Sequence, residues 1–314
     1  MKVVVVSQFG ASEVLRIEQR QDPVPDAGEA LISVEAIGVG YVDVMARRGR
    51  YVAFPEPGFV PGLEVAGRVL AVGELVDQAW VGRLVFAMPM KGGGYSSLLA
   101  IPVEQLIAIP EGLSASQAVG LGMNALVAKI ALNRVPIQSG EHIFVRGAGG
   151  GIGMMAVQIG AARGGIVTAT TSSGSRGSRL RDLGAKTIVP RDHLPDDYDV
   201  AVDTIGGEHL GTYVKRLKSN GHYILCGGIG GAPKADFGME VLGIFHRSPT
   251  FMAFSLNSVE TPAVVAAGVE LFDDAVQGKI QPTIDREMPM SSAAEAHDLV
   301  ENGAAFGKIV LKPD

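Results

Sequence analysis

The sequence contains very little cysteine, tryptophan or charge. Its 314 residues include one cysteine, Cys226, and one tryptophan, and charged residues make up 19% of the chain. A single thiol excludes an internal disulfide framework and a zinc site built from several cysteines. The six histidines show neither metal-ligand nor catalytic-triad spacing. The net charge of −6 comes without any basic run, so nucleic acid is not an expected partner.

Long hydrophobic runs are also missing. No stretch approaches 18 apolar residues without a charge or a glycine, so no membrane-spanning helix is predicted. The first six residues are too short for the apolar core of a signal peptide, and they predict a first strand instead. With 47% hydrophobic residues, the chain is expected to fold as a globular cytoplasmic protein with room for two domains.

The first 120 residues predict a β-rich domain. Runs rich in Val, Ile and Ala at 3–7, 30–36, 64–72 and 83–88 are separated by glycine and proline turns, as in a small barrel or sandwich. Ser114 is expected to cap a helix that runs, with breaks, to Leu132.

From about residue 140 the pattern changes to alternating strands and helices. Strands are predicted at 143–145, 166–171, 187–189, 200–203 and 223–225, with helices from 152 and at 175–183 and 211–217. This alternation predicts a doubly wound parallel sheet. A long helix at 262–277 follows, and the last strand, 307–312, fits best back in the first domain. The predicted domains are therefore 1–122 with 259–314, and 123–258.

A glycine-rich turn lies at the centre of the second domain. It follows the strand at 143–145 and precedes the helix from 152, and glycine there allows backbone N–H groups to approach a pyrophosphate. Gly150 and Gly153 fit the last two glycines of G-x-G-x-x-G, with Ala148 in place of the first. The turn predicts a dinucleotide site formed by Ala148, Gly149, Gly150, Gly151, Ile152 and Gly153. A glycine loop without a ligand is the alternative.

The end of the next strand bears on the choice of cofactor. An NAD site usually has an acid about 20 residues after the glycine turn, to hold the ribose 2′-hydroxyl. No acid is present there; Ser172, Ser173 and Arg176 are. Hydroxyl donors and a guanidinium suit a 2′-phosphate, so the sequence favours NADPH over NADH. The alternative for Arg176 is a solvated arginine at a helix start.

The order of these segments resembles the medium-chain dehydrogenase/reductase superfamily, in its zinc-free quinone oxidoreductase and enoyl reductase branch. The resemblance covers nearly the whole chain, in the segments 34–43, 49–51, 60–67, 93–96, 146–153, 183–185, 202–204 and 307–311. It implies a GroES-like β-barrel catalytic domain, a Rossmann domain, hydride transfer to a small electrophilic substrate, and a homodimer. The segment 251–254 is expected to line the site, to form an edge strand for dimerisation, or to be a core strand.

The resemblance also indicates which zinc ligands are missing. The positions of the Cys, His and second Cys of zinc-dependent relatives hold Gly40, Leu63 and Gly122 here. Only Glu64 remains, and one carboxylate cannot hold zinc, so an ion pair or a loop brace is its expected role. We therefore predict no metal, and reduction of an activated C=C bond or quinone by NADPH.

Further site residues follow from the resemblance. Arg191 is expected to compensate for a missing phosphate-side tyrosine, and Gly227 to let the nicotinamide approach the backbone. Lys308 is either near the cofactor or a surface lysine. Cys226 is expected to be a small buried residue and not a nucleophile.

Tyr51 is the catalytic candidate, because relatives place a proposed proton donor there; a tyrosine that merely lines the cleft is the alternative. Tyr41 and Asn124 are expected to share its substrate pocket, where Gly40, in place of the usual asparagine, opens room. Two functions stay open from the sequence: an NADPH-dependent quinone or enone reductase, and an NADPH-binding sensor or structural protein with little turnover. The sequence does not name the acceptor.

Overall fold

The computed structural model describes residues 1–191 and 193–314, and its contacts separate into two compact units. The first unit comprises Met1–Met123, Thr261–Gln277 and Pro282–Asp314, and the second comprises Asn124–Glu260 and Gly278–Gln281. The chain thus leaves the first unit and returns to it, as the placement of the last strand predicted. Each unit is described by itself below.

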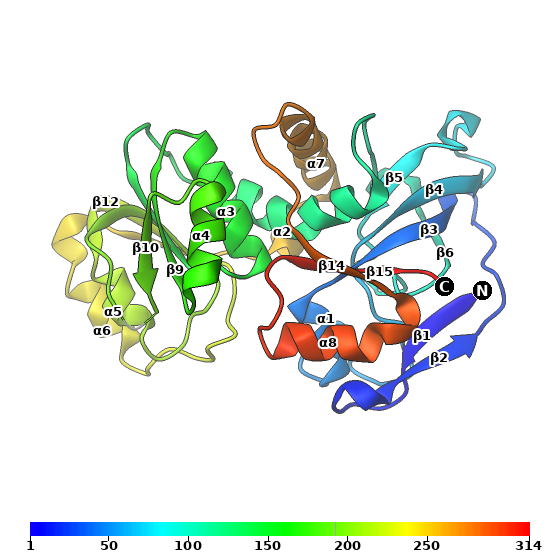
Figure 1. The fold of residues 1–314 in the computed structure, drawn as a ribbon, viewed down its shortest axis with the longest axis horizontal. Helices are drawn as coiled ribbons and strands as arrows, with labels where there is room; N and C mark the ends of the chain where they lie inside the picture. The colour runs from blue at the N-terminus through cyan, green and yellow to red at the C-terminus, as the bar shows by residue number, and fades with distance from the viewer. Residues whose placement is uncertain (192) are drawn as a thin grey trace. The chain divides into compact units, whose positions relative to one another are not determined.

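The first unit is built around a seven-stranded sheet. Its order is β14-β15-β3-β4-β5-β7, and β6 pairs with β3 (Figure 1). The last strand, β15, pairs antiparallel with β3, which confirms the predicted return of the C-terminus. The strands of this sheet are β3 (Glu29–Val39), β4 (Val65–Val72), β5 (Leu84–Ala87), β6 (Leu98–Pro102), β7 (Leu106–Ala108), β14 (Ile284–Pro289) and β15 (Lys308–Lys312). Two further strands of the unit lie outside it, β1 (Lys2–Val6) and β2 (Leu15–Gln19).

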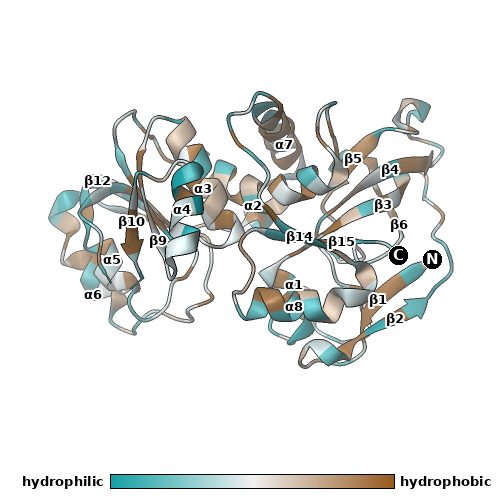
Figure 2. Cartoon of the chain, in the orientation of Figure 1, coloured by the Kyte–Doolittle hydropathy of each residue, from teal (hydrophilic) through white to brown (hydrophobic). Residues whose placement is uncertain are grey.

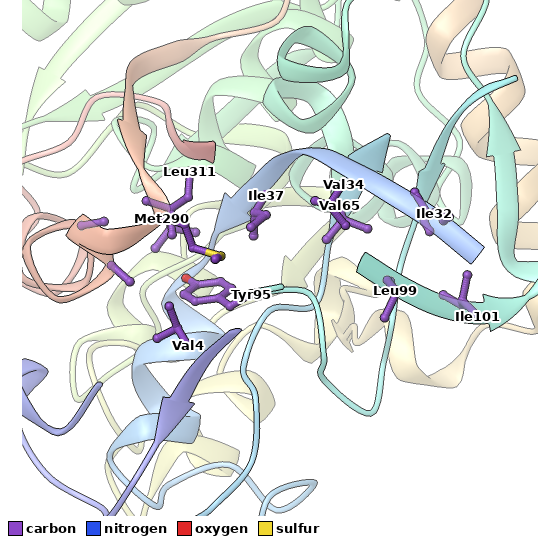
Figure 3. Close-up of a cluster of buried hydrophobic side chains, with 14 of the residues drawn as sticks. Val4, Ile32, Val34, Ile37, Val65, Tyr95, Leu99, Ile101, Met290 and Leu311 are labelled. Carbon is purple, nitrogen blue, oxygen red and sulfur yellow. The ribbon is translucent and has the colours of Figure 1, made fainter. Parts of the chain in front are cut away.

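A separate hairpin of β1 and β2 completes the β structure of this unit. Four of the five residues of β1 are buried, whereas four of the five in β2 are exposed, and Figure 2 shows the same contrast between a brown and a teal strand. The core beneath contains Tyr95, whose ring lies beside Val4 and Met290 (Figure 3). Burial of this apolar surface is the main stabilising contribution to the unit.

The helices of the first unit are α1 (Tyr41–Arg47), α7 (Thr261–Val276) and α8 (Ala293–Glu301). Neither α1 nor α8 was predicted from the sequence. The helix α2 (Ala115–Asn133) was predicted, and its expected break lies at Gly122, which has non-helical dihedral angles. This helix is long and apolar enough to span a bilayer by composition, but 78% of its apolar window is buried within the protein, as in a core helix.

The second unit is a six-stranded parallel sheet in the order β10-β9-β8-β11-β12-β13. The strands are β8 (His142–Arg146), β9 (Ile166–Thr171), β10 (Thr187–Pro190), β11 (Tyr198–Asp203), β12 (Leu217–Leu225) and β13 (Thr250–Ala253), and the helices are α3 (Gly151–Ala162), α4 (Gly174–Asp182), α5 (Leu210–Val214) and α6 (Phe237–Leu242). This is the strand order of a dinucleotide-binding sheet, and it confirms the predicted doubly wound α/β fold.

The predicted domain boundaries differ from the structure in three places. Met123 belongs to the first unit and residues 259–260 belong to the second, which shifts two boundaries by one and two residues. The third difference is larger. Residues Gly278–Gln281 belong to the second unit, although the sequence placed all of 259–314 in the first. The reason is a pair of hydrogen bonds from Gln158 of α3 to the backbone of Gln281: its amide donates to the carbonyl at 3.1 Å, and its oxygen accepts from the N–H at 2.8 Å. Sequence patterns carry no signal for such a side-chain bridge.

Candidate functional site

The glycine turn of the second unit has the geometry of an anion cradle. Gly147 has a φ of +79°, and a Cβ at Gly153 would overlap the carbonyl oxygen of Gly147, so both positions require glycine. The helix α3 starts at Gly151, and its N-cap, Gly150, makes no side-chain cap. The N–H groups of the first helical turn therefore keep their capacity to bind a phosphate. These residues fit the pyrophosphate of a dinucleotide.

The predicted 2′-phosphate residues lie directly after β9. Ser173 is the N-cap of α4, and its hydroxyl oxygen accepts from the backbone N–H of Arg176 at 3.4 Å. The Arg176 side chain lies against the glycine turn, with its Nη1 3.6 Å from where a Cβ of Gly149 would be. Ser172 is exposed next to this cap. The structure thus brings together the two sequence motifs that predicted the cofactor.

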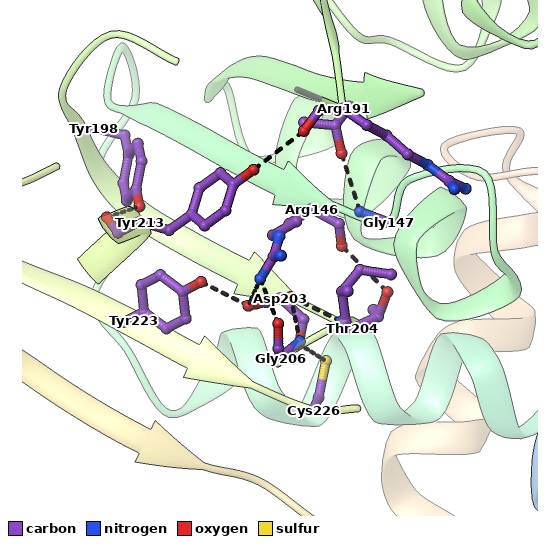
Figure 4. A network of polar contacts seen from close by, with 12 residues as sticks. Arg146, Gly147, Arg191, Tyr198, Asp203, Thr204, Gly206, Tyr213, Tyr223 and Cys226 are labelled. Carbon is purple, nitrogen blue, oxygen red and sulfur yellow. Dashed lines mark hydrogen bonds and ion pairs between the residues drawn. The ribbon is translucent and has the colours of Figure 1, made fainter. Parts of the chain in front are cut away.

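Arg191 lies at the same edge of the sheet. It follows β10, whose last residue, Pro190, pairs with Thr171 at the end of β9. The carbonyl oxygen of Arg191 accepts a hydrogen bond from the Tyr213 hydroxyl at 3.3 Å, while its side chain is exposed (Figure 4). The backbone is therefore held at this edge of the sheet, while the Arg191 side chain is exposed to solvent.

Gly227 and Cys226 follow β12 and contact the end of β11. A Cβ at Gly227 would overlap the carbonyl oxygen of Thr204, so this close approach also requires glycine. The Cys226 thiol donates to the Asp203 carbonyl oxygen at 3.6 Å. Burial raises the pKa of this thiol to about 12, with a further contribution from the Asp203 charge, so the thiol stays protonated at neutral pH. This agrees with the expectation that Cys226 is not a nucleophile, although the residue is half-buried and not fully buried as expected.

The structure gives Asn124 a contact that the sequence did not predict. The residue was assigned to the substrate pocket with Tyr41 and Tyr51. Its side-chain amide lies so close to Gly151 that a Cβ there would overlap both its carbon and its nitrogen. Within the second unit, the Asn124 side chain therefore packs against Gly151, the first residue of α3.

The tyrosines of the first unit are on or next to α1. Tyr41 is the first residue of the helix and is 40% exposed. Tyr51 follows the helix and packs against an apolar cluster that includes Phe54 and Leu63, with its ring centroid 6.1 Å from that of Phe54. Leu63 itself is almost fully buried there. At the position of the lost histidine ligand, the chain therefore has apolar packing.

Glu64 and Lys308 form a buried ion pair in the first unit, with only 4% and 2% of their side chains exposed. A second oxygen of Glu64 accepts from the N–H of Met123 at 3.0 Å. A Cβ at Gly122 would overlap this carboxylate, so the break in α2 requires glycine. The expected brace role of Glu64 is confirmed. The surface-lysine alternative for Lys308 is wrong, because the pairing with Glu64 keeps its ammonium group buried.

Asp43 is a buried carboxylate that sequence reasoning missed. Its Oδ2 accepts from the N–H of Gly40 at 2.8 Å, and its Oδ1 accepts from the N–H of Gly62 at 3.1 Å. Burial, reinforced by the charge of Glu64, raises the pKa of Asp43 from 3.8 to about 7. The residue lies within a segment that carried the family resemblance, but only folding buries it.

The donor set around these residues bears on metal binding. Among residues 1–191 and 193–314, no group of three or more His, Cys, Asp or Glu side chains is placed to hold a metal ion. Gly40, Leu63 and Gly122 offer no ligand atoms on their side chains. The zinc independence of the reaction stays a prediction.

Two known protein families match this chain, and together the matches include parts of both units. Residues 26–111 match the family described as alcohol dehydrogenase GroES-like domain, and residues 179–311 match the family described as zinc-binding dehydrogenase. The quinone oxidoreductase of Mus musculus is 28% identical over 334 residues, which cover 99% of this chain and 97% of that protein.

Two solved structures extend this comparison. The CurK enoyl reductase is 26% identical with a TM-score of 0.89, and the match covers 100% of this chain and 99% of that one. A mycobacterial protein solved in complex with NADPH is also 26% identical with a TM-score of 0.89, and the match covers 100% of both chains. The chain therefore belongs to the medium-chain dehydrogenase/reductase superfamily, in its quinone oxidoreductase branch, and it is an oxidoreductase of that superfamily.

Proposed function

We propose that the protein transfers hydride from NADPH to a quinone or an α,β-unsaturated carbonyl compound without zinc. The observation that carries this proposal is the placement of Arg176 beside the glycine turn and the Ser173 cap, with no acid between Ser172 and Arg181. A 2′-phosphate would be repelled by an acid and is favoured by a guanidinium. The mycobacterial neighbour that was solved with NADPH supports the same choice.

When bound, NADPH supplies the hydride; the protein residues bind and orient the reactants. The glycine turn and the N-terminus of α3 would hold the pyrophosphate, and Arg176 with Ser172 would hold the 2′-phosphate. The Tyr51 hydroxyl donates the proton that an enone needs at its α-carbon once the β-carbon is reduced. An activated acceptor needs no Lewis acid, which agrees with the apolar packing of Leu63.

The first test is turnover of NADPH with 1,4-quinones, enals, enones and enoyl thioesters, followed by loss of nicotinamide absorbance. Oxidation of NADPH with at least one of these acceptors is expected. Tight binding of NADPH with no turnover on any of them would instead establish the sensor or structural alternative. Stoichiometric zinc in the purified active protein would overturn the zinc-free part of the proposal.

The cofactor choice has a separate test in Arg176→Ala. Charge-assisted hydrogen bonds contribute about 1.5–3 kcal/mol, so the Kd for NADPH should rise roughly 10-fold to 150-fold while the Kd for NADH stays nearly constant. Arg179→Ala, on the same helix, is the matched control and should change neither value. Equal losses for both cofactors in Arg176→Ala would show that Arg176 does not bind the 2′-phosphate.

We also propose that the protein forms a homodimer through the second unit. The strand β13 is the last in its sheet and has one hydrogen-bonding edge unpaired within that sheet. The segment before it exposes Met239, Leu242 and Phe245, the last of these to 73%. Edge strands and exposed apolar side chains are typical of interfaces. Light scattering should give twice the chain mass, and Phe245→Glu should give the monomer mass; a monomeric parent protein would refute the proposal.

A further inference from the structure

An ion pair lies at the point where the strand order of the second unit reverses. Arg146 ends β8 and Asp203 ends β11, and the two residues are register partners in the sheet. The strands β9 and β10 continue the sheet on one side of this pair, and β12 and β13 continue it on the other. In open α/β sheets, ligands bind outside the carboxyl ends of the strands at this reversal. The ion pair therefore lies at the edge of the sheet where the proposed cofactor is expected.

The Asp203 carboxylate is fully buried and accepts hydrogen bonds at both oxygens. Its Oδ2 accepts from the Arg146 guanidinium at 3.0 Å and from the Tyr223 hydroxyl at 2.6 Å. Its Oδ1 accepts from the backbone N–H groups of Ile205 and Gly206, at 2.7 and 3.1 Å. The carboxylate thus fixes the turn that follows its own strand and ties it to two neighbouring strands.

Arg146 holds the same turn from the other side. Its Nη1 also donates to the Gly206 carbonyl oxygen at 2.8 Å, and its guanidinium covers the Tyr213 ring at 4.1 Å from the centroid. The carbonyl oxygen of Arg146 accepts from the N–H and the hydroxyl of Thr204, at 3.2 and 3.1 Å. Figure 4 shows the side chain between Tyr213 and Asp203, above the turn that ends at Gly206.

The turn at 204–206 packs against the loops on both sides of it. A Cβ at Gly147 would overlap the Thr204 hydroxyl, so this turn contacts the start of the glycine turn. On its other side, the Ile205 carbonyl oxygen accepts from the N–H of Gly230 at 2.7 Å, in the loop after β12. A shift of the turn would therefore change the spacing between the glycine turn and the loop after β12.

We propose that Arg146 is a positioning residue that holds the turn at 204–206 and so aligns the nicotinamide of the bound cofactor for hydride transfer. This inference rests on the proposed function, because it assumes a nicotinamide cofactor bound at the glycine turn. Lysine cannot replace arginine here, because a point charge on a flexible stem cannot bridge Asp203 and Gly206 while it covers an aromatic ring. Misplacement by about 1 Å costs roughly 100-fold in rate, so alignment should matter more than affinity.

The test compares Arg146→Lys with Tyr223→Phe, which removes one hydrogen bond from the same carboxylate and leaves the turn contacts in place. In Arg146→Lys, kcat should fall at least about tenfold and the deuterium isotope effect from C4 of NADPH should rise, while the Kd for NADPH changes less than about threefold. In Tyr223→Phe, thermal stability should fall while kcat and the isotope effect stay near the parent values. Equal losses of kcat in the two variants, or an unchanged kcat in Arg146→Lys, would show that Arg146 only stabilises the fold.

A second measurement separates this inference from the proposed function. The fluorescence anisotropy decay of bound NADPH reports the mobility of the nicotinamide without any acceptor. We expect a more mobile nicotinamide in Arg146→Lys than in Tyr223→Phe or the parent protein. If the parent protein turns over no acceptor, the proposed function fails while the anisotropy still decides the role of Arg146. Identical decays in all three proteins would overturn the inference.

Discussion

The buried pair of Glu64 and Lys308 allows a quantitative prediction about the first unit. Lys308→Met leaves the carboxylate of Glu64 without its cation, in a site where only 4% of that side chain is exposed. Removing one partner of a buried pair costs about 3–5 kcal/mol, because the other charge stays desolvated. With a urea m-value of about 2–3 kcal/mol/M, the unfolding midpoint should fall by roughly 1–2.5 M.

The assay can be restricted to the first unit. Trp80 is the only tryptophan in the chain, and it packs against the core of this unit. Its fluorescence during urea unfolding, without cofactor, therefore reports the unit that contains the ion pair. Arg68→Met is the matched control, because Arg68 pairs with Glu35 in the same unit with both side chains largely exposed. It should change stability by less than about 1 kcal/mol.

A double variant then isolates the interaction. In Glu64→Gln with Lys308→Met, both charges of the pair are removed, and the glutamine amide oxygen still accepts from the N–H of Met123. We expect the double variant to be destabilised by clearly less than the sum of the two single changes, with a coupling of about 2–3 kcal/mol. Single changes below about 1 kcal/mol, or strictly additive effects, would refute the reasoning that these charges are desolvated and mutually dependent.

The remaining predictions concern titration and proton donation. Burial lowers the pKa of His297 from 6.5 to about 3, so the unfolded chain binds a proton at a higher pH than the folded chain. This residue should therefore reduce the stability of the fold as the pH falls from 6.5 to 3. His297→Gln should remove that pH dependence in unfolding followed by Trp80 fluorescence. Asp43 acts in the opposite direction, because folding raises its pKa from 3.8 to about 7 and the folded chain binds a proton at the higher pH. The stability of the fold should therefore increase as the pH falls from 7 to 3.8. An unchanged dependence of stability on pH in Asp43→Asn would contradict this. Tyr51→Phe should lower kcat for enone reduction by about 100-fold or more if Tyr51 donates the proton, whereas a change within about threefold, as expected for the control Tyr41→Phe, would reduce it to a lining residue.

Local sequence patterns predicted most of the second unit correctly. The strand 166–171 and the helix that follows it have the periodicity and cap of the observed β9 and α4, because a strand, a glycine turn and a helix leave short-range signals. In the first unit, α1 and α8 were missed. The N-cap of α1 is Gly40, whose backbone N–H donates to the Asp43 carboxylate. The same carboxylate also accepts from the distant Gly62, and no periodicity reports a contact of that kind.

The features of the candidate site also fall into two groups, those that the local sequence determines and those that depend on folding. The glycine turn and the acid-free segment with Arg176 are properties of residue type and spacing, so the sequence alone determined them. The missing ligands at Gly40, Leu63 and Gly122 were identified through the resemblance of the sequence to its family. The network of Arg146, Asp203 and Tyr223, and the burial of Lys308 against Glu64, join residues far apart in the chain.

Only the tertiary structure decided these contacts, because burial and the pairing of distant charges depend on which strand ends meet. The same cause explains why Lys308, Asp43 and Asn124 were the residues whose surroundings the sequence did not predict. Residue identity indicated the cofactor that we propose for the second unit, and folding determined which charges are buried within each unit.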